Sequence, residues 1–210
     1  MATSLTLEND SSLAQGYLKV NGTTSATLTT SGITGNLTGN VTGNVTGNLT
    51  GSLTAGGSLT FATAQTATGT AVDFTGIPSW AKRITVMLSG VSTNGTSLCV
   101  IRLGSGSISS TGYQSTGWTA NTTNTTITSG LLVSGSNANS YTYTTIATLC
   151  LVNSSTNLWA MSGCGAGDFN GAFVSGGDKV LSGVLDSLRI TTVNGTDTFD
   201  AGTINICYEG

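Results

Sequence analysis

The chain has no histidine, a single proline and few charges, because Lys, Arg, Asp and Glu make up only 7% of its 210 residues. A typical soluble domain has about 25%. Without histidine the chain cannot build a Ser-His-Asp triad, a Cys-His dyad or an HExxH zinc site. With one proline and no G-X-Y period it is not collagen-like. These absences exclude several common classes of enzyme and one class of fibrous protein.

The charges that do occur have an acidic balance, with a net charge of −3 and a pI near 4.5. Proteins that bind nucleic acid normally carry a basic stripe, and this chain has none. No apolar run reaches the length of about 18 residues that a membrane-spanning helix needs. The first ten residues, MATSLTLEND, have neither a basic nor an apolar region of a secretory leader. We therefore expect no nucleic-acid partner, no membrane insertion and no secretory leader.

Four residue types dominate instead, because Thr, Gly, Ser and Asn account for more than half of the chain. Threonine and the β-branched apolar residues suit strands. No segment has helical periodicity, whereas several alternate apolar and polar residues. The composition predicts an all-β protein.

The four cysteines form no CxxC pair, and no histidine is present to complete a zinc site. Cys99, Cys150 and Cys207 lie in the apolar runs LCVIRL, IATLCLV and INICYE. We expect them to be buried free thiols that behave as small apolar residues; disulfides are the alternative. We expect no metal site and no cofactor.

Residues 33–54 contain a four-residue repeat, ITGN-LTGN-VTGN-VTGN-LTGS-LT. In an extended chain its odd positions face one side and carry only apolar residues or glycine, while Thr and Asn face the other side. The apolar positions are Ile33, Leu37, Val41, Val45, Leu49 and Leu53.

A single strand cannot bury this apolar edge, but three copies around a shared axis can. Each buried Leu or Val would contribute about 1.5–3 kcal/mol, and glycine lets the backbones approach closely. The repeat therefore predicts an intertwined trimeric β shaft over residues 33–59. A flexible Thr/Gly/Asn linker is the alternative, although a random linker has no reason to place an apolar residue at every fourth position.

Residues 1–32 form a separate small unit with a predicted β-hairpin. Tyr17, Leu18 and Val20 precede Asn21-Gly22, which is a signal for a tight type I′ turn, and apolar residues follow it. The unit is too small for a core of its own. We expect it to pack on its trimer mates or on a docking partner.

Residues 60–210 can build a sizeable core. Short alternating segments separated by turn signals predict an antiparallel, jelly-roll-like β-sandwich. The expected strands are 70–74, 83–91, 97–104, 125–133, 141–152, 158–163, 180–193 and 203–208.

Three features together resemble bacteriophage virion appendage proteins. YLKVNGTTSATLTTSGITGN (17–36) resembles the attachment end of phage fibres, and the TGN[LV] repeat resembles their shafts. FTGIPSWAKRITVMLSGVSTNGT (74–96) and RITTVNGTDTFDAGTINICYEG (189–210) resemble the terminal β-sandwich of tail fibres. The resemblance implies a homotrimer in the virion that contacts the host surface or decorates the capsid.

Two acid pairs could serve a glycosidase, which needs opposed carboxylates. Asp197 and Asp200 lie in a turn-rich connection, and Asp168 and Asp178 flank a glycine-rich stretch. That stretch, GCGAGDFNGAFVSGGD (163–178), superficially resembles a dinucleotide loop but lacks the strand-loop-helix context. We expect a long surface loop there and no catalysis.

Aromatic residues in loops suit stacking on sugar rings. Tyr113 and Trp118 in a polar stretch are the ligand-binding candidates, with Phe169 and Phe173 in the glycine-rich loop as anchors for a ligand or another protomer. Trp80 and Trp159 are expected in the core or a trimer interface. Arg102 and Arg189 lie within apolar strands, where a structural ion pair is expected.

The repeat predicts a trimer, and the resemblance implies that this trimer is a phage fibre, with a tail fibre preferred. Residues 1–32 would dock to the virion, 33–59 would form the shaft, and 60–210 would bind a host-surface glycan. A head fibre or capsid-decorating protein is the close alternative; a polysaccharide depolymerase and a cellular adhesin are less favoured.

Overall fold

A computed structural model describes residues 5–10, 15–20, 23–29, 32–34, 59–119, 124–135, 137–168 and 171–210. The chain divides into two compact units, Met1–Thr50 and Gly51–Gly210. Each unit is considered by itself. The described residues are strands, turns and extended segments, which confirms the all-β prediction.

The N-terminal unit is a four-stranded antiparallel sheet in the order β1-β2-β3-β4. The predicted hairpin is confirmed by the pairing of β2 with β3, in which Val20 lies opposite Thr23. The Asn21-Gly22 turn lies outside the described residues. Ile33 lies in β4, whereas the other shaft positions, Leu37 to Leu53, lie outside the described residues. The strands are β1 (Leu5–Asp10), β2 (Gln15–Val20), β3 (Thr23–Thr29) and β4 (Gly32–Thr34).

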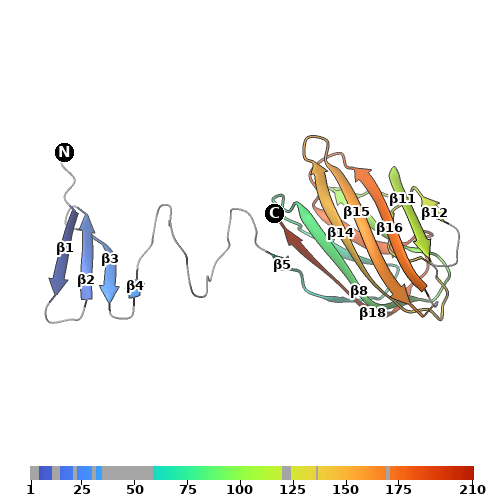
Figure 1. Ribbon diagram of the computed structural model, residues 1–210, viewed down its shortest axis with the longest axis horizontal. Coiled ribbons are helices and arrows are strands. Elements are labelled where there is room, and N and C mark those ends of the chain that lie inside the picture. The colour runs from blue at the N-terminus through green and yellow to red at the C-terminus, as the bar shows by residue number, and fades with distance from the viewer. Residues whose placement is uncertain are drawn as a thin grey trace. The chain divides into compact units, whose positions relative to one another are not determined.

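The C-terminal unit has two antiparallel sheets in a sandwich-like arrangement (Figure 1). The large sheet has the order β12-β11-β16-β15-β14-β8-β18-β5, and β6 also pairs with β18. Its strands are β5 (Thr60–Phe61), β6 (Gln65–Thr66), β8 (Arg83–Thr93), β11 (Tyr113–Thr119), β12 (Thr125–Ile127), β14 (Tyr143–Asn153), β15 (Leu158–Gly167), β16 (Gly171–Val180) and β18 (Phe199–Glu209).

The small sheet has the order β10-β9-β17-β7, with β13 also paired to β9. Its strands are β7 (Ala71–Thr75), β9 (Cys99–Ser105), β10 (Ser107–Ile108), β13 (Leu131–Leu132) and β17 (Ser187–Thr192). In Figure 1 the large sheet faces the viewer and the small sheet lies behind it.

The core lies between the two sheets, and strand alternation fills it. Along β8, Ile84, Val86 and Leu88 are buried while the residues between them are only partly buried. Leu188 and Ile190 face them from the small sheet as members of the same apolar cluster. Full burial of each such side chain contributes about 1.5–3 kcal/mol, so apolar burial is the main source of stability here.

The sequence did not predict two of the central strands. The stretch 163–178, expected as a surface loop, is mostly the β15–β16 hairpin, and the polar stretch 113–119 is β11, which pairs with β16 along its whole length. Glycine explains the difference: a Cβ on Gly177 would lie 2.4 Å from the Gln114 carbonyl oxygen and 2.9 Å from Leu131. Gly177 therefore looks like a loop signal in the sequence but is needed for close packing inside the sandwich. Conversely, residues 181–186 are not a strand.

The cysteines follow the expectation only in part. All four are free thiols, and Cys99 and Cys207 are buried as predicted, but Cys150 is exposed. The apolar run around Cys150 predicts burial, but Cys150 alternates with the buried Leu149 and so lies on the outer side of β14. The Tyr143 hydroxyl donates a hydrogen bond to the Cys99 sulfur, while burial raises the pKa of Cys99 to about 12.

The expectations for the buried aromatic and arginine side chains have mixed outcomes. Trp159 is buried as expected. Trp80 is 44% exposed in the single chain and so is not in the core, while its expected place in a trimer interface stays a prediction; its ring lies 5.6 Å from that of Tyr208. Arg189 forms the expected ion pair, donating from two nitrogens to Asp73 at 2.7 Å. Arg102 instead donates to backbone carbonyl groups.

Asp197 ties together the β8–β9 and β17–β18 connections at one end of the sandwich. Its carboxylate accepts hydrogen bonds from the backbone N–H of Ser97 at 2.9 Å and from the Asn194 side chain at 2.7 Å. These bonds favour the ionised form, with that of Asn194 the largest effect, and so lower the pKa of Asp197. The Asp197 carboxylate therefore stabilises the arrangement of these two loops.

Asp197→Ala is expected to lower stability at pH 7 by about 1 kcal/mol, because two donors lose their acceptor but water can reach them. Since the folded-state pKa lies below the unfolded one, the wild-type advantage is present above about pH 4 and is lost as the pH falls through the folded pKa. Thermal unfolding of both proteins across pH measures it. Asp200→Ala is the control, because no hydrogen bond joins the Asp200 carboxylate to the described residues. An equal loss at all pH values would contradict the prediction.

The β8–β18 pairing contains irregularities that depend on glycine. The register shifts between Phe199 and Ala201 and again between Ala201 and Thr203. Gly202 lies there with a φ of +96°, and a Cβ on it would lie 2.5 Å from the carbonyl oxygen of Gly90. Only glycine provides both the left-handed φ and this close approach.

Candidate functional site

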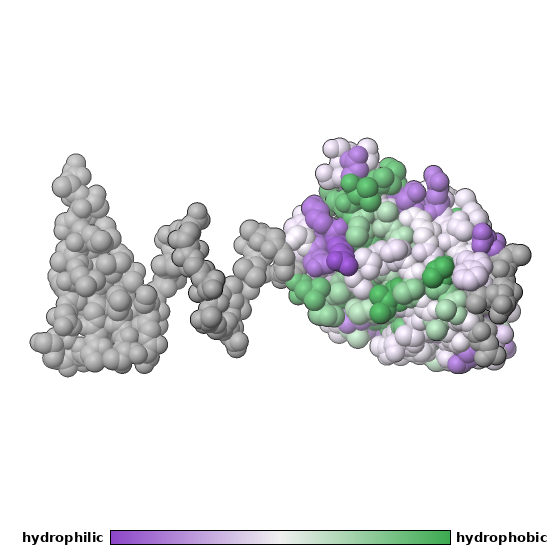
Figure 2. Space-filling view, in the orientation of Figure 1, coloured by the Kyte–Doolittle hydropathy of each residue, from purple (hydrophilic) through white to green (hydrophobic). Residues whose placement is uncertain are grey.

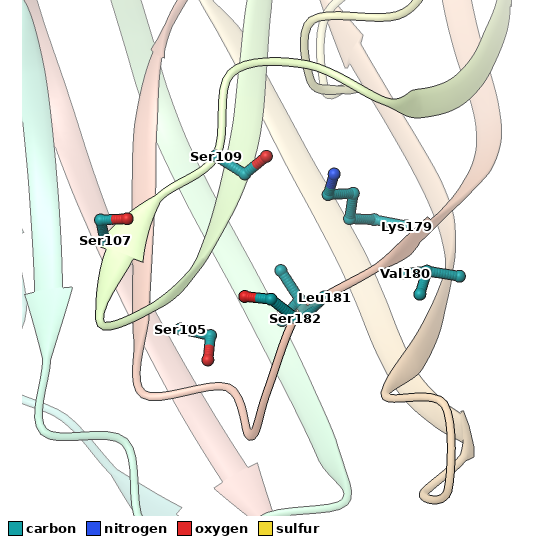
Figure 3. A pocket seen from close by; sticks show the side chains of 7 residues that line it. All are labelled: Ser105, Ser107, Ser109, Lys179, Val180, Leu181 and Ser182. Carbon is teal, nitrogen blue, oxygen red and sulfur yellow. The ribbon is translucent and has the colours of Figure 1, made fainter.

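A polar hollow of about 320 Å³ lies where the β9–β10 turn meets the end of β16 and the segment that follows it. We call it the serine pocket (Figure 3). Figure 3 shows Ser107 and Ser109 on one side, with Lys179 and Val180 coming from β16 on the other. The lining residues are Ser105, Ser107, Ser109, Lys179, Val180, Leu181 and Ser182.

Lys179 supplies the positive charge of the serine pocket. Its ammonium nitrogen donates to the Thr111 carbonyl oxygen at 2.7 Å and lies 5.0 Å from the centre of the Tyr113 ring. A ring face attracts a cation and so helps to hold it. Because an ammonium has three donors, Lys179 can still donate to a ligand.

Tyr113 holds two parts of the serine pocket in place, the segment that follows β10 and the Lys179 side chain. Its hydroxyl accepts from the Leu103 N–H at 2.7 Å and donates to the Ser109 carbonyl oxygen at 2.9 Å. Burial raises the pKa of Tyr113, so the hydroxyl stays protonated and keeps this bond to the 109–112 segment. The ring and hydroxyl together position Lys179 and the opposite wall.

The β9–β10 turn is held from the other side by Asp186. The Gly106 N–H and the Ser187 hydroxyl donate to its two carboxylate oxygens at 2.6 and 2.7 Å. Both hydrogen bonds lower the pKa of Asp186, and the bond from Ser187 has the larger effect. Gly106 has a φ of +74°, which suits this tight turn.

The serine pocket offers hydroxyl groups and one ammonium to a ligand. The hydroxyls of Ser105, Ser107 and Ser182 make no hydrogen bond within the described part of the chain. Serine hydroxyls both donate and accept, and lysine donates to anionic groups. This set matches a polyhydroxylated ligand that carries a carboxylate or another anionic substituent.

The structure separates the four sequence-predicted ligand residues. Tyr113 and Phe173 are each only 1% exposed and pack within the sandwich, so neither side chain is accessible to a ligand. Trp118 is 46% exposed on the opposite side of β11 from Tyr113. Phe169 lies outside the described residues. The alternation in YQSTGWT could have shown that Tyr113 and Trp118 face opposite ways.

The pocket serines were not singled out from the sequence. GSGSISS (104–110) looks like an ordinary polar turn, and its partners Lys179 and Ser182 lie some 70 residues away. Only strand order brings these segments together.

One of the two acid pairs, Asp168 and Asp178, does not have the separation of a glycosidase site. Asp168 and Asp178 lie at opposite ends of the β15–β16 hairpin, so about 20 Å of strand separates them, whereas inverting enzymes hold their carboxyl groups at most about 9.5 Å apart. Asp168 accepts from the Thr142 hydroxyl at 2.7 Å. In the other pair, the Asp197 carboxylate accepts hydrogen bonds from Ser97 and Asn194.

Two further searches concern only the described residues. They contain no group of three or more Cys, Asp or Glu side chains that could hold a metal ion. They also contain no helix long and apolar enough to cross a membrane. No family model, curated protein or solved structure matches the chain.

Proposed function

We propose that this protein is a homotrimeric bacteriophage fibre. Residues 1–32 attach it to a docking protein of the virion, 33–59 form an intertwined shaft, and 60–210 form a jelly-roll-like terminal domain that adheres to a host-surface glycan. The role is structural and adhesive rather than catalytic. A tail fibre is preferred, and a head fibre or capsid-decorating protein is the second candidate.

The observation that carries this proposal is the four-residue repeat. Six apolar residues at a constant spacing give one face of an extended strand an apolar edge that needs partners. Parallel copies of the same chain, in register around one axis, would cover this apolar edge at every repeat. The sandwich-like domain after the repeat and the small sheet before it fit the three-part build of a fibre.

The second candidate, a head fibre or capsid-decorating protein, has the same three-part build around the repeat. Immunogold labelling of virions distinguishes the two, because a tail fibre labels at the tail and a head fibre labels on the capsid. Virions without label at either place would contradict the whole proposal.

The serine pocket is the candidate glycan site of the terminal domain. If it binds an acidic glycan, fluorescently labelled full-length protein should stain host cells, and Lys179→Met should reduce staining by about tenfold, as expected for one lost charged contact. Ser107→Leu on the opposite wall should act in the same direction. Binding curves on whole cells measure both.

Lys82→Met is the matched control, since Lys82 also donates to a carbonyl oxygen, that of Ser79, but lies outside the serine pocket. It should leave staining unchanged. Equal staining by the wild type and both pocket variants would contradict glycan binding by the serine pocket. Absence of staining by the wild type would contradict adhesion to the host surface.

A further inference from the structure

The outer face of the large sheet carries a row of apolar side chains that crosses five strands. Strand register places them side by side: Met87 on β8, Ile146 on β14, Cys164 on β15, Val174 on β16 and Trp118 on β11. We call these five residues the apolar row. Neighbours across strands have Cβ atoms about 4.5–5.5 Å apart, so the row is continuous.

Most of the apolar row is open to solvent in a single chain. Ile146 is 52% exposed, Val174 50% and Trp118 46%, and Cys164 is also exposed. A hollow of about 210 Å³ lies beside it, lined by Ile146, Thr148, Ser162, Gly163 and Cys164. Figure 2 shows green apolar patches on this face among pale, weakly polar residues. Contiguous exposed apolar surface of this kind marks an interaction site.

The rows on either side of the apolar row carry no charge. One consists of small alanine and threonine residues; the other has hydroxyls and glycine. Their members are Ala172, Ala166 and Thr144 on one side, and Thr116, Gly176, Ser162, Thr148 and Thr85 on the other. Charges begin only one row further on, with Asp178 and the Arg83–Glu209 ion pair.

The outer face of the small sheet is different. There Asp73, Arg189 and Arg102 lie in one row across β7, β17 and β9. That face has the charged, solvated character expected of a sheet side open to water. The large sheet's outer face therefore departs from the pattern that the same domain follows on its other side.

Absence of charge is what a face needs when it meets copies of itself. Around a symmetry axis each charge is brought near its own copies, and like charges repel. An anionic or polar partner would instead be matched by complementary charges, which this face lacks. The observations favour other copies of this chain as the occupant.

The area of the face indicates how such a contact would be held. Five strands spaced by about 4.8 Å, over seven residues of about 3.3 Å, give roughly 550 Å². Shared between two neighbours, this is less than the about 1,000 Å² of a free-standing interface. A shaft that holds three copies together would give the terminal domains an effective concentration in the millimolar range. At that concentration even a small interface between the terminal domains can form.

We propose that the outer face of the large sheet, centred on the apolar row, packs against the same face of the two other copies in the homotrimer. This inference rests on the proposed trimer and adds where the terminal domains meet. The contact would bury Cys164, which an isolated chain leaves exposed.

Cys164 makes the contact measurable in the full-length protein. In a Cys150→Ser background it is the one exposed native thiol, because Cys99 and Cys207 are buried and the pKa of Cys99 is raised to about 12. Its reaction with a bulky maleimide-polyethylene glycol is timed by mass spectrometry. The reference is a cysteine at Val184, which is 56% exposed away from the face, in a chain lacking Cys150 and Cys164.

If the faces pack together, Cys164 of the trimer should react at least about tenfold more slowly than the reference cysteine, which corresponds to a face closed for nine-tenths of the time. Val174→Lys should abolish this protection, since it places a charge in the face of every copy. Val184→Lys, the same change at a similarly exposed valine, should preserve it. Light scattering on the same samples gives the mass.

The outcomes separate this inference from the proposed function. A trimer whose Cys164 reacts as fast as the reference, or remains protected in Val174→Lys, overturns the inference but leaves the fibre proposal standing. A monomeric wild type overturns both. A trimer with protection that only Val174→Lys removes supports both.

Discussion

Replacing Val41 and Val45 by aspartate is expected to abolish association, so that the mass falls from about 63 kDa, three times 21.0 kDa, to that of one chain. In the proposed shaft these positions face the axis, where three copies of each residue meet. Six carboxylates would then be buried without partners, and burying even one unpaired charge costs several kcal/mol. The burial of about 1.5–3 kcal/mol per aliphatic side chain cannot offset this.

The repeat itself offers the matched control. Asn40 and Asn44 lie next to the two valines but on the polar side of the same extended strand. Asn40→Asp with Asn44→Asp adds the same charge at almost the same place and should leave the trimer intact. Multi-angle light scattering measures all three proteins. Equal masses for the two double variants would show that the repeat is a linker rather than a shaft.

Gly202→Ala is expected to have the largest effect on the terminal domain. The added Cβ would lie 2.5 Å from the Gly90 carbonyl oxygen and 2.6 Å from the Cα of Val91, which are backbone atoms that cannot rotate away. The left-handed φ of +96° adds about 1–2 kcal/mol for any residue with a Cβ. With the overlap, the loss should reach about 3–5 kcal/mol, which corresponds to a drop in Tm of roughly 10 °C or more.

Gly195→Ala separates the two causes of this loss. Gly195 also has a left-handed φ, +70°, but a Cβ there would have no atom within 4 Å. It should therefore cost only the conformational part, about 1–2 kcal/mol. Thermal unfolding of the two variants beside the wild type provides the comparison. If Gly202→Ala is no worse than Gly195→Ala, the close approach of β8 and β18 is not as described.

Prediction from the sequence worked best where neighbouring residues alternate in a regular way. The β8 segment RITVMLSGV and the β14 segment around IATLCLV were both expected as strands, because local alternation reports directly on which side chains face a core. The same local rule failed for β16, GAFVSGGDKV, whose three glycines look like a loop. Close approach to Gln114 and Leu131 explains one of them, Gly177, and neither contact is visible in the local sequence.

The candidate sites show the same limit. Trp118 could be singled out because an aromatic residue in a polar stretch stands out, but the sequence could not say that it joins Ile146, Cys164 and Val174 in one row. Those residues come from four strands, and their meeting depends on strand order and register. Likewise, Ser107 and Lys179 meet only because β9–β10 and the end of β16 lie together.

The sequence by itself determined the all-β class, the buried Cys99 and Cys207, and the repeat that motivates a trimer. Each follows from composition or from a period that neighbouring residues reveal. Tertiary structure alone decided which glycines are in strands, that Tyr113 and Phe173 are buried, and that the apolar row lies between two uncharged rows on the outer face of the large sheet. The physical reason is that burial and cross-strand neighbours are set by pairing between segments far apart in the chain, and local alternation contains no information about that pairing.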